Sequence, residues 1–199
     1  MSKTKKRKKR KSKKSTSKAF LLLLLSVIIV CVLGYLGYNQ FIKGTHPVKY
    51  ENYVSEYCEL YGVPRDLIYA TIYVESGFDE NAVSNVGAIG LTQIMPDTLS
   101  WLETKTGENY TEEDLRNPEI SIKYCTLFYS ILLEKFKNEE TAICAYHAGI
   151  NRVAGWLENR EYSSDGVTLD TVPSSATAHY LSKINNARKI YNNLYKEEL

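Results

Sequence analysis

The chain has 199 residues, of which 44% are hydrophobic, so it is long enough for one domain with an appendage and too apolar for a disordered protein. Eleven of its 25 Lys and Arg residues lie within residues 1–18, which leaves 14 basic and 23 acidic residues for the remainder, a net charge of −9. A basic tail on an acidic body argues against a nucleic-acid-binding role for the whole chain.

An apolar run without a charged residue follows the basic tail and covers residues 19–38. A helix of that length, at ~1.5 Å per residue, spans the ~30 Å hydrocarbon layer, which predicts one transmembrane helix. The basic tail predicts a cytoplasmic N-terminus, so the rest of the chain would lie outside the cell membrane after a single pass. A cleaved signal peptide is the alternative, but its apolar region would span about 7–15 residues and end in a small-x-small site.

The remaining chain is expected to form a short stalk over residues 39–49 and a domain over residues 50–199. Apolar periodicity predicts a series of helices in this domain, over residues 50–60, 65–76, 91–104, 118–137, 139–148, 151–158 and 175–195. Strand signals are weak, with room for a short strand or two in the loops, so the domain is expected to be mainly α. The loop over residues 77–90 is long enough to be functional.

The outer domain holds three of the four cysteines, Cys58, Cys125 and Cys144, whereas Cys31 lies in the apolar run. An odd number cannot form a full disulfide framework. Their spacing also lacks the CxxC or clustered His of a metal site. Buried free thiols are therefore the first expectation. A bridge between Cys125 and Cys144 is the alternative in an oxidising setting.

The first candidate for chemistry is Glu75, which ends the apolar helix IYATIYVES at the mouth of the long loop. Partial burial among apolar neighbours disfavours the charged form of a carboxyl group and raises its pKa, as a general acid near neutral pH requires. The alternative is an ordinary solvated glutamate in the last turn of a helix.

Three further motifs follow in chain order. NAVSNVGAIGLTQIMP, residues 81–96, holds Gly87 and Gly90, which permit unusual dihedrals, and Gln93, which can both donate and accept hydrogen bonds. AYHAGINRVAGWL, residues 145–157, places Tyr146 before a glycine turn. ATAHYLSKINNARKIY, residues 176–191, places Tyr180 near the start of the last helix. Taken singly, each motif also fits a plain helix junction or a core tyrosine.

In this order, ES, GLxQIMP, AYxAG and a late TxxYL closely resemble the lytic transglycosylase family with the soluble-lytic-transglycosylase (SLT) domain, whose fold is related to goose-type lysozyme. The opening YGVPxDLIYAxIxxESxF is similar to that of small membrane-anchored members. The resemblance covers about residues 50–195. It implies a lysozyme-like helical domain after one N-terminal transmembrane helix, with peptidoglycan glycan strands as the substrate.

The resemblance also implies roles for single residues. Glu75 falls on the catalytic acid/base. The residues implied to bind or line the substrate cleft are Ser84, Gln93, Met95, Tyr146 and Tyr180. Neither a metal nor a cofactor is implied.

The implied reaction uses one carboxyl group. Glu75 would protonate the bridging oxygen of the β-1,4 bond between N-acetylmuramic acid and N-acetylglucosamine, assisted by the substrate's own 2-acetamido group. The carboxylate would then take the proton of the muramyl 6-hydroxyl, which attacks within the same sugar. The product would carry a 1,6-anhydromuramyl end, and no water would be consumed.

The sequence departs from the family pattern at three positions. His147 stands where Asn is usual in AYNAG, Ala176 stands where a cleft glutamate is usual, and Thr92 replaces a common Met. Two other functions stay open. One is a lysozyme-like muramidase, a hydrolase that needs a second carboxylate roughly 6.5–9.5 Å away if inverting, for which Asp79 and Asp97 are the nearest in sequence. The other is a low-activity glycan-binding scaffold of an envelope machine.

Overall fold

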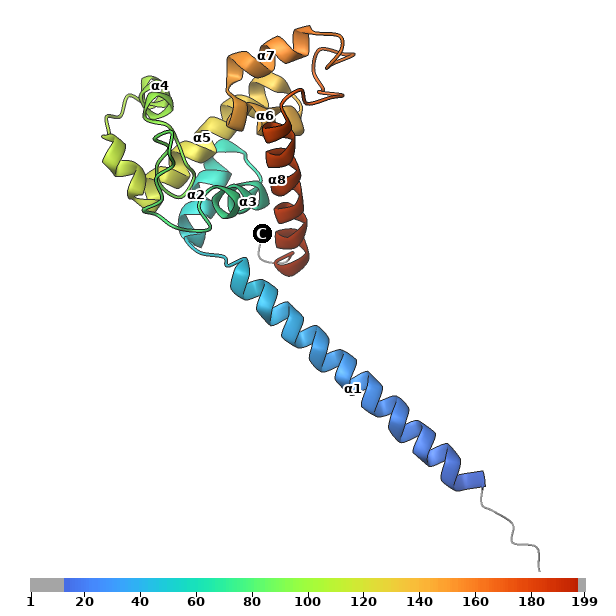
Figure 1. The fold of residues 1–199 in the computed structure, drawn as a ribbon. Coiled ribbons are helices and arrows are strands. Elements are labelled where there is room, and N and C mark those ends of the chain that lie inside the picture. Colours follow the sequence, from blue (N-terminus) through green and yellow to red (C-terminus); the bar gives the residue numbers. More distant parts are fainter. Residues whose placement is uncertain (1–12, 197–199) are drawn as a thin grey trace, which may run out of the picture. The chain divides into compact units, whose positions relative to one another are not determined.

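The computed structural model describes residues 13–196, and the chain divides into two compact units, Met1–Thr45 and His46–Leu199. The described part of the first unit is one helix, α1 (Lys13–Thr45), drawn in blue in Figure 1. Helix α1 continues through residues 39–45 of the stretch expected to form a stalk. Residues 1–12 of the expected basic tail lie outside the described residues.

Within α1, Phe20–Thr45 is long and apolar enough to cross a membrane. No share of its most apolar window is buried, whereas the core helix of a soluble protein would be mostly buried. A signal sequence near the N-terminus passes the same test of length and composition. Length and apolar composition of this stretch therefore fit both an anchor and a signal sequence.

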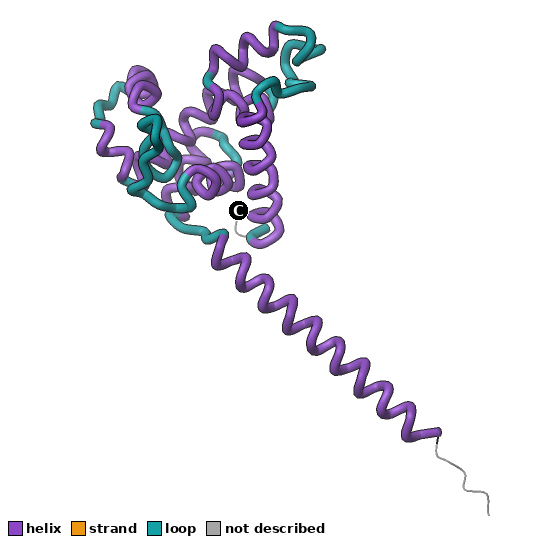
Figure 2. Tube along the Cα trace, viewed as in Figure 1, coloured by secondary structure: helices purple, strands orange, loops and turns teal. Residues whose placement is uncertain are grey.

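The second unit is helical, as the sequence predicts. Its elements are α2 (Glu51–Tyr61), α3 (Arg65–Glu75), α4 (Pro96–Thr106), a 3₁₀ turn η1 (Glu112–Arg116), α5 (Pro118–Phe136), α6 (Glu139–Ala148), α7 (Ile150–Glu158) and α8 (Ser175–Leu194). In the described part of this unit, β pairing is limited to two isolated bridges, Val83 with Ile89 and Ile89 with Ile94. The loops gather beside α4 and beyond α7 (Figure 2).

Helix α5 organises the domain, because it packs against α2, α4 and α6 (Figure 1). Helix α8 packs against α3 and α6, which brings the end of the chain to the start of the domain. Tyrosine contributes much of the core, and the fully buried examples are Tyr69, Tyr124, Tyr129 and Tyr191. This burial of apolar surface is what fixes α3 and α8 side by side.

Local chemistry sets the helix boundaries. Asn117 accepts a hydrogen bond from the Glu119 N–H ahead of Pro118, and Ser174 accepts one from the Thr177 N–H at the start of α8. The prediction that a helix begins at residue 91 is wrong, because α4 begins at Pro96. Residues 91–95 continue the long loop instead, and a positive φ of 51° at Gln93 interrupts any helix there.

The three cysteines of the domain are buried and free, so the alternative of a Cys125–Cys144 bridge is not what the structure holds. Burial raises the pKa of the Cys58 thiol to about 12 and that of the Cys144 thiol to about 12. Protonated buried thiols behave as small apolar groups, so these cysteines are core residues.

Candidate active site

Glu75 is the last residue of α3 and is half-buried. The Tyr180 hydroxyl, from the second turn of α8, donates a hydrogen bond of 2.8 Å to the Glu75 Oε1 atom. The two residues are 105 positions apart in the sequence, and the packing of α3 against α8 brings them together. The structure therefore joins two of the predicted site residues directly.

The surroundings of Glu75 shift the pKa of its carboxyl group. Burial raises the pKa of Glu75 to about 7, while the hydrogen bond from Tyr180 and the positive charge of Lys183 act in the opposite direction. Near neutral pH both the protonated and the ionised forms are therefore populated. A group in that state can donate a proton in one step and accept one in the next.

The motif loop, defined here as residues 77–95, is held by its own backbone. The Gly90 N–H donates to the Ala82 carbonyl over 2.9 Å, and the Ile89 N–H donates to the Ile94 carbonyl over 3.1 Å. Ser76, the neighbour of Glu75, donates from its hydroxyl to the Leu91 carbonyl over 2.8 Å. The loop is thereby tied to the end of α3 that carries the acid.

Both glycines singled out in the motif loop have positive φ angles, 89° at Gly87 and 78° at Gly90. The prediction of unusual dihedrals is confirmed. The two positions differ in the room available for a side chain. A Cβ atom at Gly90 would lie 2.0 Å from the Leu115 carbonyl oxygen, whereas one at Gly87 would meet nothing within 4 Å. Gly90 therefore lets the loop backbone approach η1 closely.

Three predicted site residues belong to the motif loop. The Ser84 hydroxyl oxygen accepts the Ala88 N–H over 2.9 Å, which leaves its proton available for donation. The Gln93 side-chain nitrogen donates to the carbonyls of Ala82 and Gly90, so Gln93 stabilises the loop and its amide oxygen is the atom left for a ligand. Met95 precedes α4 and is 37% exposed. No hydrogen bond found among the described residues joins any of the three to Glu75.

Tyr146 is placed by α6 and reaches the motif loop. Its hydroxyl donates to the Thr92 carbonyl over 2.8 Å, and its ring stacks on Tyr129 with centroids 4.5 Å apart. Burial raises the pKa of the Tyr146 hydroxyl, and the charges of Cys125 and Glu75 add to that effect, so Tyr146 and Glu75 lie within electrostatic reach of each other. Thr92, the residue that replaces a common Met, is buried and its hydroxyl lies 2.9 Å from the Ser121 hydroxyl.

The sequence did not reveal two side chains that interact with the Glu75–Tyr180 pair. Lys183 lies one turn beyond Tyr180 on α8, and this i, i+3 spacing was the available signal. His147 drew attention only as a departure from AYNAG, yet its ring stacks on the Tyr180 ring with centroids 4.6 Å apart. Ala176, where a carboxylate was expected, is exposed in the first turn of α8.

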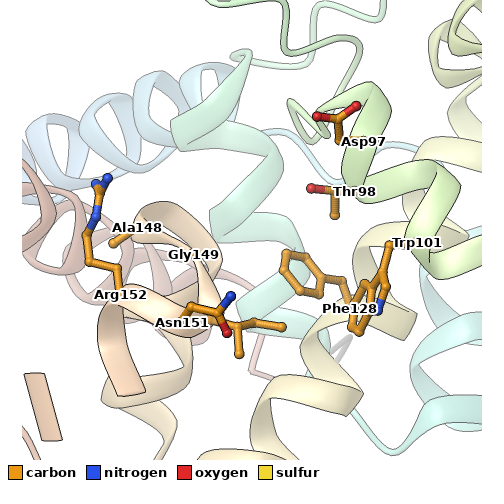
Figure 3. A pocket seen from close by; sticks show the side chains of 9 residues that line it. Asp97, Thr98, Trp101, Phe128, Ala148, Gly149, Asn151 and Arg152 are labelled. Atoms are coloured by element: carbon orange, nitrogen blue, oxygen red, sulfur yellow. The ribbon is translucent and has the colours of Figure 1, made fainter. Parts of the chain in front are cut away.

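A groove of about 610 Å³ lies between α4 and the turn that joins α6 to α7. Figure 3 shows Asp97, Thr98 and Trp101 of α4 on one side, Asn151 and Arg152 on the other, with Phe128 between them. Glu75 does not line this groove.

A second groove, of about 550 Å³, lies where α3 and α8 pack together. It is lined by His46, by Tyr73, Val74 and Gly77 at and beyond the end of α3, and by Lys183, Asn186, Ala187 and Ile190 of α8. Glu75 does not line this groove, although its sequence neighbour Val74 does.

A protein-family model described as the transglycosylase SLT domain matches residues 52–167. The chain is 30% identical over 146 residues to the soluble lytic murein transglycosylase of Salmonella typhimurium, covering 69% of this chain and 22% of that protein. It is 30% identical over 177 residues to the membrane-bound lytic murein transglycosylase C of Serratia proteamaculans, covering 77% and 49%. The chain thus spans from about a fifth to a half of the length of these curated relatives.

Two solved structures are similar. One is an inactive glutamate-to-glutamine mutant of the lytic transglycosylase Slt from Pseudomonas aeruginosa, with 27% identity and a TM-score of 0.66 over 74% of this chain and 24% of that chain. The other is the 70 kDa soluble lytic transglycosylase of Escherichia coli, with 24% identity and a TM-score of 0.68 over 76% and 25%. The second likeness concerns the fold alone. Both agree with a lysozyme-like helical domain.

Proposed function

The chain belongs to the transglycosylase SLT domain family, and on that premise we propose that it is a peptidoglycan lytic transglycosylase. It cleaves the β-1,4 bond between N-acetylmuramic acid and N-acetylglucosamine and leaves a 1,6-anhydromuramyl end. Glu75 is the catalytic acid/base. Its half-buried carboxyl group, with a pKa raised to about 7 and one oxygen hydrogen-bonded to Tyr180, is the observation that carries the proposal.

The two proton transfers follow from that carboxyl group. Protonated Glu75 donates its proton to the bridging oxygen, so the glycosidic bond breaks and the electron pair leaves with the N-acetylglucosamine oxygen. The 2-acetamido group of the muramyl residue stabilises the anomeric carbon. The ionised Glu75 then accepts the proton of the muramyl 6-hydroxyl as that oxygen bonds to the anomeric carbon, which restores the acid.

Tyr180 supports the ionised form between the two steps, because a hydrogen bond donated to a carboxylate favours its charge. Lys183 acts in the same direction through its charge. Burial opposes both, and the balance leaves the pKa of Glu75 close to neutral pH. An acid of that pKa serves both steps with little loss of either form.

Residues of the motif loop and of α6 have the remaining proposed roles in binding the substrate and in holding the loop. The Ser84 hydroxyl retains a proton to donate and the Gln93 amide retains an oxygen to accept, which suits the acetamido and hydroxyl groups of an amino sugar. Met95 offers partly exposed apolar surface at the start of α4. Tyr146 acts through the Thr92 carbonyl, by fixing the motif loop against α5 and α6.

We further propose that α1 anchors the chain in the cell membrane as a single pass, with the N-terminus cytoplasmic and the domain facing the cell wall. The apolar, unburied stretch Phe20–Thr45 and the similarity to membrane-bound lytic murein transglycosylases support this proposal. Protease treatment of spheroplasts tests it, since the domain should be released from intact spheroplasts and the anchor should stay in the membrane fraction.

The activity is tested with the full chain in detergent, purified peptidoglycan and mass spectrometry of the released muropeptides. We expect the wild type to release anhydromuropeptides and Glu75→Gln to release none, because the amide cannot donate the required proton. Glu59→Gln, at an exposed position on α2, is the matched control and should behave as the wild type.

The same experiment separates the two other functions. Reducing ends in place of anhydro ends would show a hydrolase of the lysozyme type, with Asp97 as the carboxylate exposed in the groove between α4 and α7. Asp79 is less suited to that role, because its carboxylate accepts the Asn81 N–H and shapes the motif loop. Release of nothing by either protein would favour a glycan-binding scaffold.

A further inference from the structure

The position of the Tyr180 hydroxyl depends on what holds the Tyr180 ring. Tyr180 is 6% exposed, and the imidazole of His147 stacks on its ring at 4.6 Å between centroids and 28° between planes. His147 comes from α6 and Tyr180 from α8, so the stacked pair joins two helices next to the carboxyl group of Glu75. A shift of the ring would move the hydroxyl off its 2.8 Å hydrogen bond.

His147 is itself fixed to α8 at a second point. Its Nδ1 atom lies 3.2 Å from the hydroxyl oxygen of Thr177, a buried residue one turn before Tyr180. Helix α6 ends at the next residue, Ala148, and the capping residue Gly149 that follows has a φ of 92°. The imidazole is therefore held by a hydrogen bond on one side and a ring contact on another, while the residue as a whole stays exposed.

We propose that His147 is a positioning residue, whose imidazole holds the Tyr180 ring so that the phenol hydroxyl stays on Glu75. This inference rests on the proposed function, because it concerns the same proton-transfer site. It assigns a role to the position at which the chain departs from AYNAG, where an asparagine side chain offers no aromatic ring to stack.

The imidazole performs this role in its neutral form. Partial burial and the charge of Arg152, on α7, lower the pKa of His147 below its ordinary value of 6.5. A neutral ring adds no charge beside Tyr180 near pH 7. Thr177 and Tyr180 of α8 are the other groups that face it.

The charge state of Glu75 reports on the Tyr180 contact. Besides Tyr180, the groups that interact electrostatically with Glu75 among the described residues include Lys183 of α8, Cys125 and Tyr129 of α5 and Tyr146 of α6. Substitution of His147 removes none of these four side chains. A change in the pKa of Glu75 that is caused by a weaker hydrogen bond from Tyr180 can therefore be measured separately from the effects of these groups.

The test is a double-mutant cycle between His147→Ala and Tyr180→Phe in the full chain in detergent. We expect His147→Ala to lower kcat on soluble peptidoglycan strands roughly three- to tenfold with little change in KM. It should also raise the pKa of Glu75, followed by ¹³C NMR, by roughly half a unit, in the same direction as Tyr180→Phe. In the Tyr180→Phe background His147→Ala should change neither quantity further.

Three variants act as controls. His147→Phe keeps the stacked ring and should retain most of kcat, whereas His179→Ala, at an exposed position beside Tyr180, should match the wild type. Thr177→Val removes the hydroxyl that contacts Nδ1 of His147, so it should lower kcat and raise the pKa of Glu75 by less than His147→Ala does. This variant keeps the inference testable if His147→Ala lowers the yield of folded protein.

The inference would be overturned if His147→Ala and Tyr180→Phe had additive effects on kcat and on the pKa of Glu75. An equal loss of kcat in His147→Phe and His147→Ala would also overturn it. The NMR titration needs no turnover, so it separates the two proposals. An inactive wild type in which His147→Ala still shifts the pKa of Glu75 through Tyr180 contradicts the proposed function and keeps the positioning role.

Discussion

Two regions meet at the end of α3 and are built in different ways. The motif loop is held mainly by backbone hydrogen bonds within residues 77–95, with Gln93 bonded to two carbonyls of the same loop. The aromatic pair, His147 and Tyr180, is held by side chains from helices far apart in the sequence. Substitutions that change backbone freedom should therefore affect the stability of the loop most. The aromatic pair should be most sensitive to the loss of single side-chain atoms.

The largest effect is expected where the loop backbone has no room. Gly90→Ala would place a Cβ atom 2.0 Å from the Leu115 carbonyl oxygen at a φ of 78°, so it should lower the free energy of unfolding by about 3 kcal/mol or more and abolish activity. Denaturant unfolding of the domain measures this. Gly87→Ala, with open space around it, should lose only about 1 kcal/mol, and equal losses at the two positions would contradict the close approach.

The second effect concerns the acid between the two regions. Burial raises the pKa of folded Glu75 above its ordinary value of 4.5, so its contribution to stability is present below pH 4.5 and is lost as pH rises through about 7. Glu75→Gln removes the ionisation. The variant should be more stable than the wild type by roughly 1–3 kcal/mol at pH 8 and similar to it at pH 4. Thermal unfolding at the two pH values gives the comparison, and a pH-independent difference would speak against a buried acid.

The third effect tests the aromatic pair. Tyr180→Phe keeps the ring and removes the hydroxyl that donates to Glu75, so kcat should fall about tenfold while the unfolding free energy changes by about 1 kcal/mol. Because this hydrogen bond lowers the pKa of Glu75, its loss should move the decline of activity at high pH to still higher pH. Tyr53→Phe on α2 is the control, and an unshifted pH–rate profile in Tyr180→Phe would count against the contact.

The smallest effect is expected at Asp97, which is exposed in the groove and belongs to neither region. Asp97→Asn should change the rate less than about twofold and leave the anhydro product unchanged, because the proposed reaction uses one carboxyl group. Quantitative muropeptide analysis measures both. A loss of activity as large as that of Glu75→Gln would instead favour hydrolysis with Asp97 as the second carboxylate.

The sequence predicted the parts of the molecule that depend on local chemistry. Helices α5, α6 and α8 have clear caps or periodicity, and their boundaries fall within one residue of the expectation. The start of α4 was missed, because GLTQI has an apolar pattern that also fits a helix, whereas the positive φ at Gln93 depends on loop hydrogen bonds that no local pattern reveals.

The candidate site divides in the same way. Local sequence predicts the unusual dihedrals of Gly87 and Gly90 and offers Glu75 only as a candidate. The catalytic role of Glu75 and the roles of Ser84, Gln93, Met95, Tyr146 and Tyr180 came from the resemblance. The stacking of His147 on Tyr180 and the reach of Tyr146 to the Thr92 carbonyl join helices through tertiary packing. Such contacts depend on how α3, α5, α6 and α8 pack against one another. Local patterns in the sequence do not reveal that packing.

The most direct test of the central claim is a ¹³C NMR titration of the Glu75 carboxyl in the full chain in detergent, assigned with Glu75→Gln. A half-buried acid that serves both proton transfers should titrate with a pKa of about 7. A midpoint at the ordinary value of 4.5 would contradict the account, because the group would then be ionised throughout the pH range in which it must donate its proton.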